Sequence, residues 1–119
     1  MILVDTSVWI YHLRHGEGHL KSLLQEAHVM THDFILGELA CGNLKNRKEI
    51  LSLLRALPRA SLVTHEEALH FIEKRALAGL GLGYIDLHLL SSAQLSEVPL
   101  WTFDKKLQSS AAKLGLSYR

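Results

Sequence analysis

The sequence predicts an α/β fold in which a short central parallel sheet is flanked by helices. Short apolar segments alternate along the chain with longer segments of helical periodicity, and this alternation is typical of βαβ units. The chain has 119 residues, of which 48% are hydrophobic and 21% charged, a balance found in globular domains. This length is sufficient for one core but not for two, so we expect a single domain over residues 1–119.

The predicted strands are short apolar runs that end at turn or capping residues. The first run leads from Met1 directly to Asp5, and another surrounds Trp101. Short, nearly uninterrupted apolar runs suit strands that are buried on both faces of a parallel sheet. The predicted strands lie at residues 2–5, 28–31, 60–63 and 99–102, with a final edge strand at 116–118.

Helices are predicted between these strands, where apolar residues recur with helical spacing. Thr6 with Ser7, Asp33 and Thr64 supply N-cap side chains, and Pro58 ends a helix. Glycines separate further helical segments. The predicted helices span residues 6–13, 19–27, 33–42, 47–57, 64–78, 85–94 and 105–114.

Four of the twelve acidic residues occupy unusual positions. Asp5 and Asp104 each follow an apolar strand, and the carboxyl ends of parallel strands meet at one rim of a sheet. Glu38 and Asp86 lie inside apolar helical segments, where an acid is normally protonated, paired or bound to metal. Taken singly, Asp5 and Asp104 could simply begin helices, and the dipole of a helix could stabilise Asp86 in its first turn. The combination indicates a shared cation.

The chemistry of such a site favours Mg²⁺ or Mn²⁺, which prefer oxygen ligands. A hard cation polarises a phosphoryl oxygen and lowers the pKa of a bound water, so four converging carboxylates suggest a metal-dependent phosphodiesterase. Thr6, Ser7 and Thr102 flank the acids in the sequence and could hold them by hydrogen bonds, although an ordinary capping role explains Thr6 equally well.

The charge balance is compatible with a polyanionic substrate. The formal net charge is +1, but setting the four acids aside leaves eight acidic against thirteen basic residues, a balance of +5. Two basic clusters follow the candidate ligands in the sequence, although a solvated surface is their ordinary explanation. They comprise Lys45, Arg47, Lys48, Lys105 and Lys106.

The sequence favours a cytoplasmic protein. The single cysteine, Cys41, cannot form an internal disulfide, as expected in a reducing compartment. The longest stretch with a single charged residue, 76–94, carries that charge on Asp86 and also contains three glycines. Both features argue against a membrane span. Met1 leads directly into the first strand, so we expect no signal peptide.

Four segments carry a resemblance to a known family. They read ILVDTSVWI at 2–10, GEL at 37–39, GYIDLHLLSSA at 83–93 and LWTFDKKL at 100–107. In order and content they resemble the PIN-domain ribonucleases, most closely the VapC-type toxins of bacterial and archaeal toxin–antitoxin systems. The resemblance spans the whole chain, and no acid of the family's pattern is missing.

The resemblance implies a PIN-like three-layer α/β sandwich with a Mg²⁺- or Mn²⁺-dependent endoribonuclease site. It implies that the four acids bind metal and orient the attacking water, and that two hydroxyl residues support them; the basic clusters above become candidate RNA contacts. The acids are Asp5, Glu38, Asp86 and Asp104, and the hydroxyl residues are Ser7 and Thr102.

The resemblance also implies partners. A VapC-type protein would form a homodimer, for which Trp9, Tyr11 and Leu13 are candidate interface residues unless they pack in the core. It would be inhibited by a cognate antitoxin that inserts a C-terminal segment near the active groove, and the pair would bind operator DNA.

Two alternatives stay open from the sequence. One is a PIN-family RNA-processing nuclease outside a toxin–antitoxin system. The other is a metal-binding or protein-interaction module that has the fold without turnover, which the intact set of acids argues against. A phosphoryl-transfer receiver domain is disfavoured because Thr6 and Ser7 stand where it would need further acids.

Overall fold

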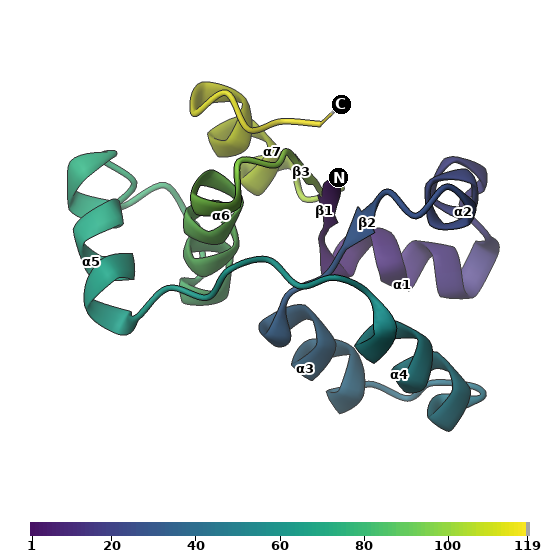
Figure 1. Ribbon diagram of the computed structural model, residues 1–119. Coiled ribbons are helices and arrows are strands. Elements are labelled where there is room, and N and C mark those ends of the chain that lie inside the picture. The colour runs from purple at the N-terminus through teal and green to yellow at the C-terminus, as the bar shows by residue number, and fades with distance from the viewer. Residues whose placement is uncertain (119) are drawn as a thin grey trace.

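The computed structural model describes residues 1–118 and contains a three-stranded parallel sheet between layers of helices (Figure 1). The central strand β1 (Ile2–Val4) pairs with β2 (Val29–Met30) on one side and with β3 (Leu100–Trp101) on the other. The strand order β2-β1-β3 therefore reverses at β1. In open parallel sheets, functional groups gather beyond the carboxyl ends of the strands at this point.

Seven helices lie within residues 1–118, and each corresponds to a helix predicted from the sequence, with ends displaced by a few residues. They are α1 (Thr6–His15), α2 (Gly18–Gln25), α3 (Asp33–Cys41), α4 (Arg47–Ala56), α5 (His65–Lys74), α6 (Tyr84–Ser96) and α7 (Lys105–Lys113).

The helices cover both faces of the sheet, which confirms the predicted α/β sandwich. Figure 1 shows α6 on one side of the strands with α5 outside it, and α1 with α2 on the opposite side. Helices α3 and α4 pack as a pair beside α1, and α7 packs against β3. Two helices that carry candidate acids, α3 and α6, thus approach the sheet from different sides.

Helix α6 is the central helix of the core. Every residue from Leu87 to Ala93 is buried, as expected for a segment that is nearly apolar around its whole circumference. Burying such a helix on all sides fixes its position firmly, since interior packing is dense. The first turn of α6, which carries Asp86, is therefore held rigidly relative to the sheet.

The prediction of a strand at residues 60–63 is wrong. The structure has a single parallel bridge between Thr31 and Arg59, and Ala60 donates its N–H to the carbonyl of Thr31 over 2.9 Å. Pairing stops there because the next N–H, of Ser61, is bonded to the Ser96 hydroxyl at 2.9 Å. The final edge strand is likewise a single bridge, between Leu100 and Ser117.

Within residues 1–118 no helix combines the length and the apolar character that a membrane crossing requires.

Candidate active site

The carboxylate of Asp5 is fixed by a dense set of hydrogen bonds. Asp5 follows β1 directly and is the N-cap of α1, where Thr6 and Ser7 were expected to supply the cap. Its Oδ2 accepts hydrogen bonds from the Ser7 hydroxyl at 2.7 Å and the Thr102 hydroxyl at 2.8 Å, with the Ser7 N–H at 3.4 Å. The side chain is almost fully buried, so these contacts determine its orientation.

The same hydroxyls tie the end of β3 to the start of α1. The Ser7 hydroxyl accepts the N–H of Phe103 at 3.0 Å, and the Thr102 hydroxyl accepts the N–H of Asp104 at 3.0 Å. Each hydroxyl thus accepts from the backbone after β3 and donates its proton to Asp5. Ser7 and Thr102 therefore occupy the supporting positions predicted for them, and they join two segments far apart in the sequence.

Asp86 and Asp104 are held in the same manner as Asp5, each at the beginning of a helix. Asp104 is the N-cap of α7, and its Oδ1 accepts the N–H of Leu107 at 2.8 Å. Asp86 lies in the first turn of α6, and its Oδ2 accepts the N–H of Gly83 at 3.1 Å. Helix N-termini carry partial positive charge, which stabilises carboxylates placed there.

We refer to Asp5, Asp86 and Asp104 as the aspartate trio. In each member one carboxylate oxygen accepts the anchoring hydrogen bonds, and the other oxygen accepts none within residues 1–118. Neither ion pair in the described part of the chain involves a member of the trio. Three oxygens with negative charge are therefore available to a ligand.

Electrostatic coupling shows that the trio lies together. Partial burial raises the pKa of Asp86, and the negative charges of Asp5 and Asp104 raise it further, while the hydrogen bond from Gly83 opposes the rise. Asp86 is thus coupled electrostatically to both Asp5 and Asp104.

Glu38 differs from the expectation of an acid enclosed by apolar groups. It is exposed, because α3 turns Ile35 and Leu39 toward the core and leaves Glu38 at the edge of that buried face. Its Oε1 accepts a hydrogen bond from the Thr6 hydroxyl at 2.7 Å. Thr6 follows Asp5 in α1, so this bond brings Glu38 to the border of the trio.

A cavity of about 590 Å³ adjoins Glu38 between α1 and the α3–α4 connection. Arg14 and Lys45 line it together with Glu38, so one predicted basic cluster does contribute to the site's surroundings. The guanidinium of Arg47, by contrast, donates to the carbonyls of Ala40 and Gly42 at the end of α3. Lys106 lies against Gly81 in the loop that leads to Asp86.

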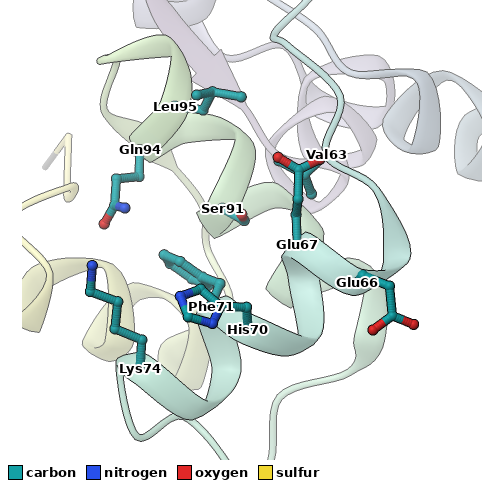
Figure 2. Close-up of a pocket in the computed structure, with 9 residues that line it drawn as sticks. All are labelled: Val63, Glu66, Glu67, His70, Phe71, Lys74, Ser91, Gln94 and Leu95. Carbon is teal, nitrogen blue, oxygen red and sulfur yellow. The ribbon is translucent and has the colours of Figure 1, made fainter.

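A separate hollow of about 410 Å³ lies between α5 and α6 (Figure 2). Figure 2 shows His70 and Phe71 in its centre, with Lys74 and Gln94 at one end. None of the four candidate acids lines this hollow, which therefore stands apart from the rim of the sheet.

No group of three or more His, Cys, Asp or Glu side chains in residues 1–118 is arranged to hold a metal ion. The aspartates nevertheless offer hard carboxylate oxygens, the type that Mg²⁺ and Mn²⁺ prefer. Mg²⁺ characteristically uses one or two carboxylates and keeps several waters. The chemistry of the donors therefore suits such an ion.

Sequence reasoning missed Arg14, and it did not identify Glu38 as the acid that Thr6 binds. A signal existed for both, because residues 6, 10, 13 and 14 share one face of a helix that begins at residue 6. It also missed the exposed ring of Phe103, which follows Thr102, and it considered Tyr11 only for a dimer interface.

With this geometry established, comparison with known proteins gives the family. The family model described as "PIN domain" matches residues 2–113. Ribonuclease VapC32 from Mycobacterium tuberculosis is 43% identical over 118 residues, which cover 98% of this chain and 95% of the relative, in both strains CDC 1551 and H37Rv. The chain therefore belongs to the PIN-domain family and is of the VapC type.

A solved structure supports the fold independently. The crystal structure of PAE2754 from Pyrobaculum aerophilum superposes with a TM-score of 0.63 and covers 92% of this chain and 78% of that chain. Sequence identity is 17%, so this likeness concerns the fold alone.

Proposed function

We propose that this protein is an endoribonuclease that hydrolyses RNA phosphodiester bonds with the help of Mg²⁺ or Mn²⁺. The observation that carries the proposal is the meeting of three helix N-termini at one rim of the sheet, each presenting an aspartate with one free oxygen. The kinship with a protein named ribonuclease gives the reaction class. Asp5, Glu38, Asp86 and Asp104 are the proposed catalytic and metal-binding residues.

The roles of the residues follow from how each is held. Asp5 and Asp104 present fixed oxygens because the start of a helix holds each carboxylate. Asp86, whose pKa is raised by partial burial, would orient the attacking water by accepting its hydrogen bond. When bound, Mg²⁺ or Mn²⁺ polarises the phosphoryl oxygen and neutralises charge that develops during displacement.

The surroundings of the trio suit a polyanionic chain. Arg14 and Lys45 beside Glu38, and Lys105 with Lys106 after Asp104, lie on both sides of the acids. Positive charge around an acidic centre attracts the phosphate backbone, and a cation held by the acids would offset their repulsion of the scissile phosphate.

We further propose that the activity is that of the toxin in a toxin–antitoxin pair that acts in the cytoplasm. The VapC name of the relatives supports this assignment. On this proposal the protein forms a homodimer, a cognate antitoxin blocks the site, and the complex with antitoxin binds operator DNA. The exposed, unpaired Cys41 is compatible with a reducing compartment.

The proposal is tested with the purified protein and single-stranded RNA, in Mn²⁺ and in excess chelator. We expect cleavage in Mn²⁺ alone, with Asp104→Asn protein purified in parallel as the control for contaminating nucleases. Undiminished cleavage in chelator would overturn the metal mechanism, and no cleavage in either would favour the interaction module.

The toxin role needs a separate test. Expression of the protein alone should arrest growth of a bacterial host, and co-expression of the neighbouring gene's product should restore it. Cleavage of RNA without growth arrest, and without binding to that product, would assign the protein to RNA processing.

A further inference from the structure

Beside the aspartate trio two aromatic rings are unusually exposed. Tyr11 is 46% exposed and Phe103 is 47% exposed, although each ring packs against another. Their centroids are 5.6 Å apart with an interplanar angle of 84°, an edge-to-face contact. Such a contact leaves ring surface open to solvent, and we call this pair the aromatic shelf.

The shelf is built into the framework of the acids. Phe103 stands between Thr102 and Asp104, and its N–H is bonded to the hydroxyl of Ser7 at 3.0 Å. Tyr11 lies one helical turn beyond Ser7 on the same face of α1. The hydroxyl of Ser7 thus connects Phe103 to the carboxylate of Asp5, and Tyr11 contacts Phe103 through its ring.

Neighbouring rings make the shelf rigid. The buried ring of Trp101 supports Phe103 at a centroid distance of 5.8 Å, and His15 lies 5.1 Å from Tyr11 on the other side. A rigid aromatic surface binds a flat partner with little loss of conformational entropy. Exposing two such rings to water is unfavourable unless a ligand covers them.

Cationic residues lie next to the shelf in the sequence. Lys105 and Lys106 follow Asp104 immediately, and Arg14 precedes His15 on α1. Within residues 1–118 these cations take part in no ion pair. Aromatic rings interleaved with free cations are the arrangement with which proteins bind single-stranded nucleic acid, where bases stack on rings and cations follow the backbone.

We propose that the aromatic shelf stacks an unpaired nucleobase of the RNA substrate next to the scissile phosphate. This inference rests on the proposed ribonuclease function and extends it to a binding subsite. A base in a duplex is covered on both faces by its neighbours, so a shelf of this kind selects RNA whose bases are unstacked. A protein partner would gain less from the free cations and the adjoining acids.

The test measures RNA binding separately from cleavage. Fluorescence anisotropy of a labelled single-stranded RNA is recorded in chelator with the wild type, Tyr11→Leu and Phe103→Leu. Leucine keeps an apolar side chain but removes the ring, so we expect binding at least about fivefold weaker for either variant, the lower end of what base stacking contributes. Tyr11→Phe and Phe103→Trp keep a ring and should bind like the wild type.

Two controls separate stacking from general effects. Leu53→Ala changes a side chain that is 61% exposed on α4, and it should not alter RNA binding. The salt dependence should keep its slope in Phe103→Leu, whereas Lys105→Gln should reduce it, because only the lysine contacts phosphate. Thermal melts show whether each variant is folded.

A series of RNAs with one abasic nucleotide at successive positions locates the base. One position should weaken wild-type binding about as much as Phe103→Leu does, and the two changes together should add little. The shelf is overturned if the effects of the abasic nucleotide and of Phe103→Leu add fully at every position. It is also overturned if both leucine variants bind normally, even when the protein cleaves RNA. Weaker capture of the neighbouring gene's product with unchanged RNA binding also overturns it and assigns the rings to a protein interface.

Failure of the shelf and failure of the nuclease are distinguishable. Leucine variants that bind RNA weakly support the shelf whether or not the wild type cleaves. No measurable binding of RNA by the wild type overturns the shelf, and the cleavage assay in Mn²⁺ decides the enzyme function independently.

Discussion

The aspartate trio and Glu38 are held in contrasting ways. Each aspartate is anchored by backbone N–H groups at the start of its own helix, whereas Glu38 lies inside α3 and depends on one hydroxyl, that of Thr6. A carboxylate bound to the backbone moves only if its helix moves. A glutamate on an exposed helix face can change rotamer when a ligand arrives, so we expect the trio to be preset and Glu38 to adjust.

The helix that carries Glu38 also begins differently. Its N-cap is His32, a fully buried histidine whose Nδ1 accepts the N–H of Phe34 at 2.9 Å and whose Nε2 lies 3.0 Å from the Ser92 hydroxyl. Helices α1 and α7 begin instead with aspartate caps. A histidine cap accepts the hydrogen bond of the helix only while its Nδ1 carries no proton. The histidine cap of α3 can therefore be tested by its dependence on pH.

The largest effect is expected for the anchored aspartates. Asp5→Asn or Asp104→Asn should reduce RNA cleavage by about 100-fold or more, because each removes a fixed negative oxygen from the metal and water. Asp33→Asn is a matched control, since Asp33 also lies in a first helical turn but is paired with Arg59. Cleavage by Asp104→Asn within threefold of wild type would remove that residue from the site.

A smaller effect is expected at the loosely held glutamate. Glu38→Gln should lower cleavage by about tenfold, and Thr6→Val, which removes the bond that holds Glu38, by a few-fold, the scale of one hydrogen bond. Initial rates at several Mn²⁺ concentrations provide the measurement. If Glu38→Gln were as damaging as Asp5→Asn, the two modes of attachment would not differ in importance.

The electrostatic strain within the trio should appear in thermal melts. Because the pKa of Asp86 is raised above its usual value of 3.8, the unfolded chain loses this proton more easily. The contribution of Asp86 to the free energy of unfolding is fully present below pH 3.8 and is lost as the pH rises through its raised pKa. In chelator at neutral pH, Asp86→Asn should therefore melt higher than wild type.

In added Mn²⁺ the wild type should melt at a higher temperature than Asp86→Asn, the reverse of the order in chelator. Metal that binds the folded state raises the melting temperature by mass action, and the variant should gain much less than the wild type. Equal metal-induced shifts would mean that Asp86 serves its helix and not a metal.

The smallest effect concerns the histidine cap of α3. Burial lowers the pKa of His32 and His88 lowers it further, while Asp33 opposes the shift. The unfolded chain then binds the proton more readily, so stability should fall as pH drops below about 6.5, toward the lowered pKa. His32→Asn keeps a capping side chain without the titration and should flatten this dependence in denaturant unfolding at pH 5 to 7. The exposed His70→Gln should leave it unchanged; a flat wild-type profile would contradict the prediction.

The sequence predicted the location of the trio because strand ends and helix starts are local signals. An acid after a buried strand lies at the sheet rim whatever the rest of the chain does, and this applies to Asp5 and Asp104. The exposure of Glu38 was not predictable in this way. Residues 34–41 are apolar around most of the helix, so the pattern does not show that Ile35 and Leu39 form the buried face.

Non-local competition explains the other differences. The strand predicted at 60–63 ends early because the Ser96 hydroxyl, from α6, takes the N–H of Ser61. Arg47 was a candidate RNA contact, but its guanidinium binds carbonyls at the end of α3. No pattern within either segment contains these partners, which tertiary packing alone brings close.

The hydroxyl network around Asp5 also bears on how the protein is made. Ser7 and Thr102 are separated by 95 positions, yet both must be present to orient the carboxylate of Asp5. During translation Asp5 leaves the ribosome first and waits for residues 102–104, so this long-range contact forms late. An incomplete nascent chain would therefore carry no assembled site, and the cell would meet this chemistry only after β3 and α7 have been synthesised.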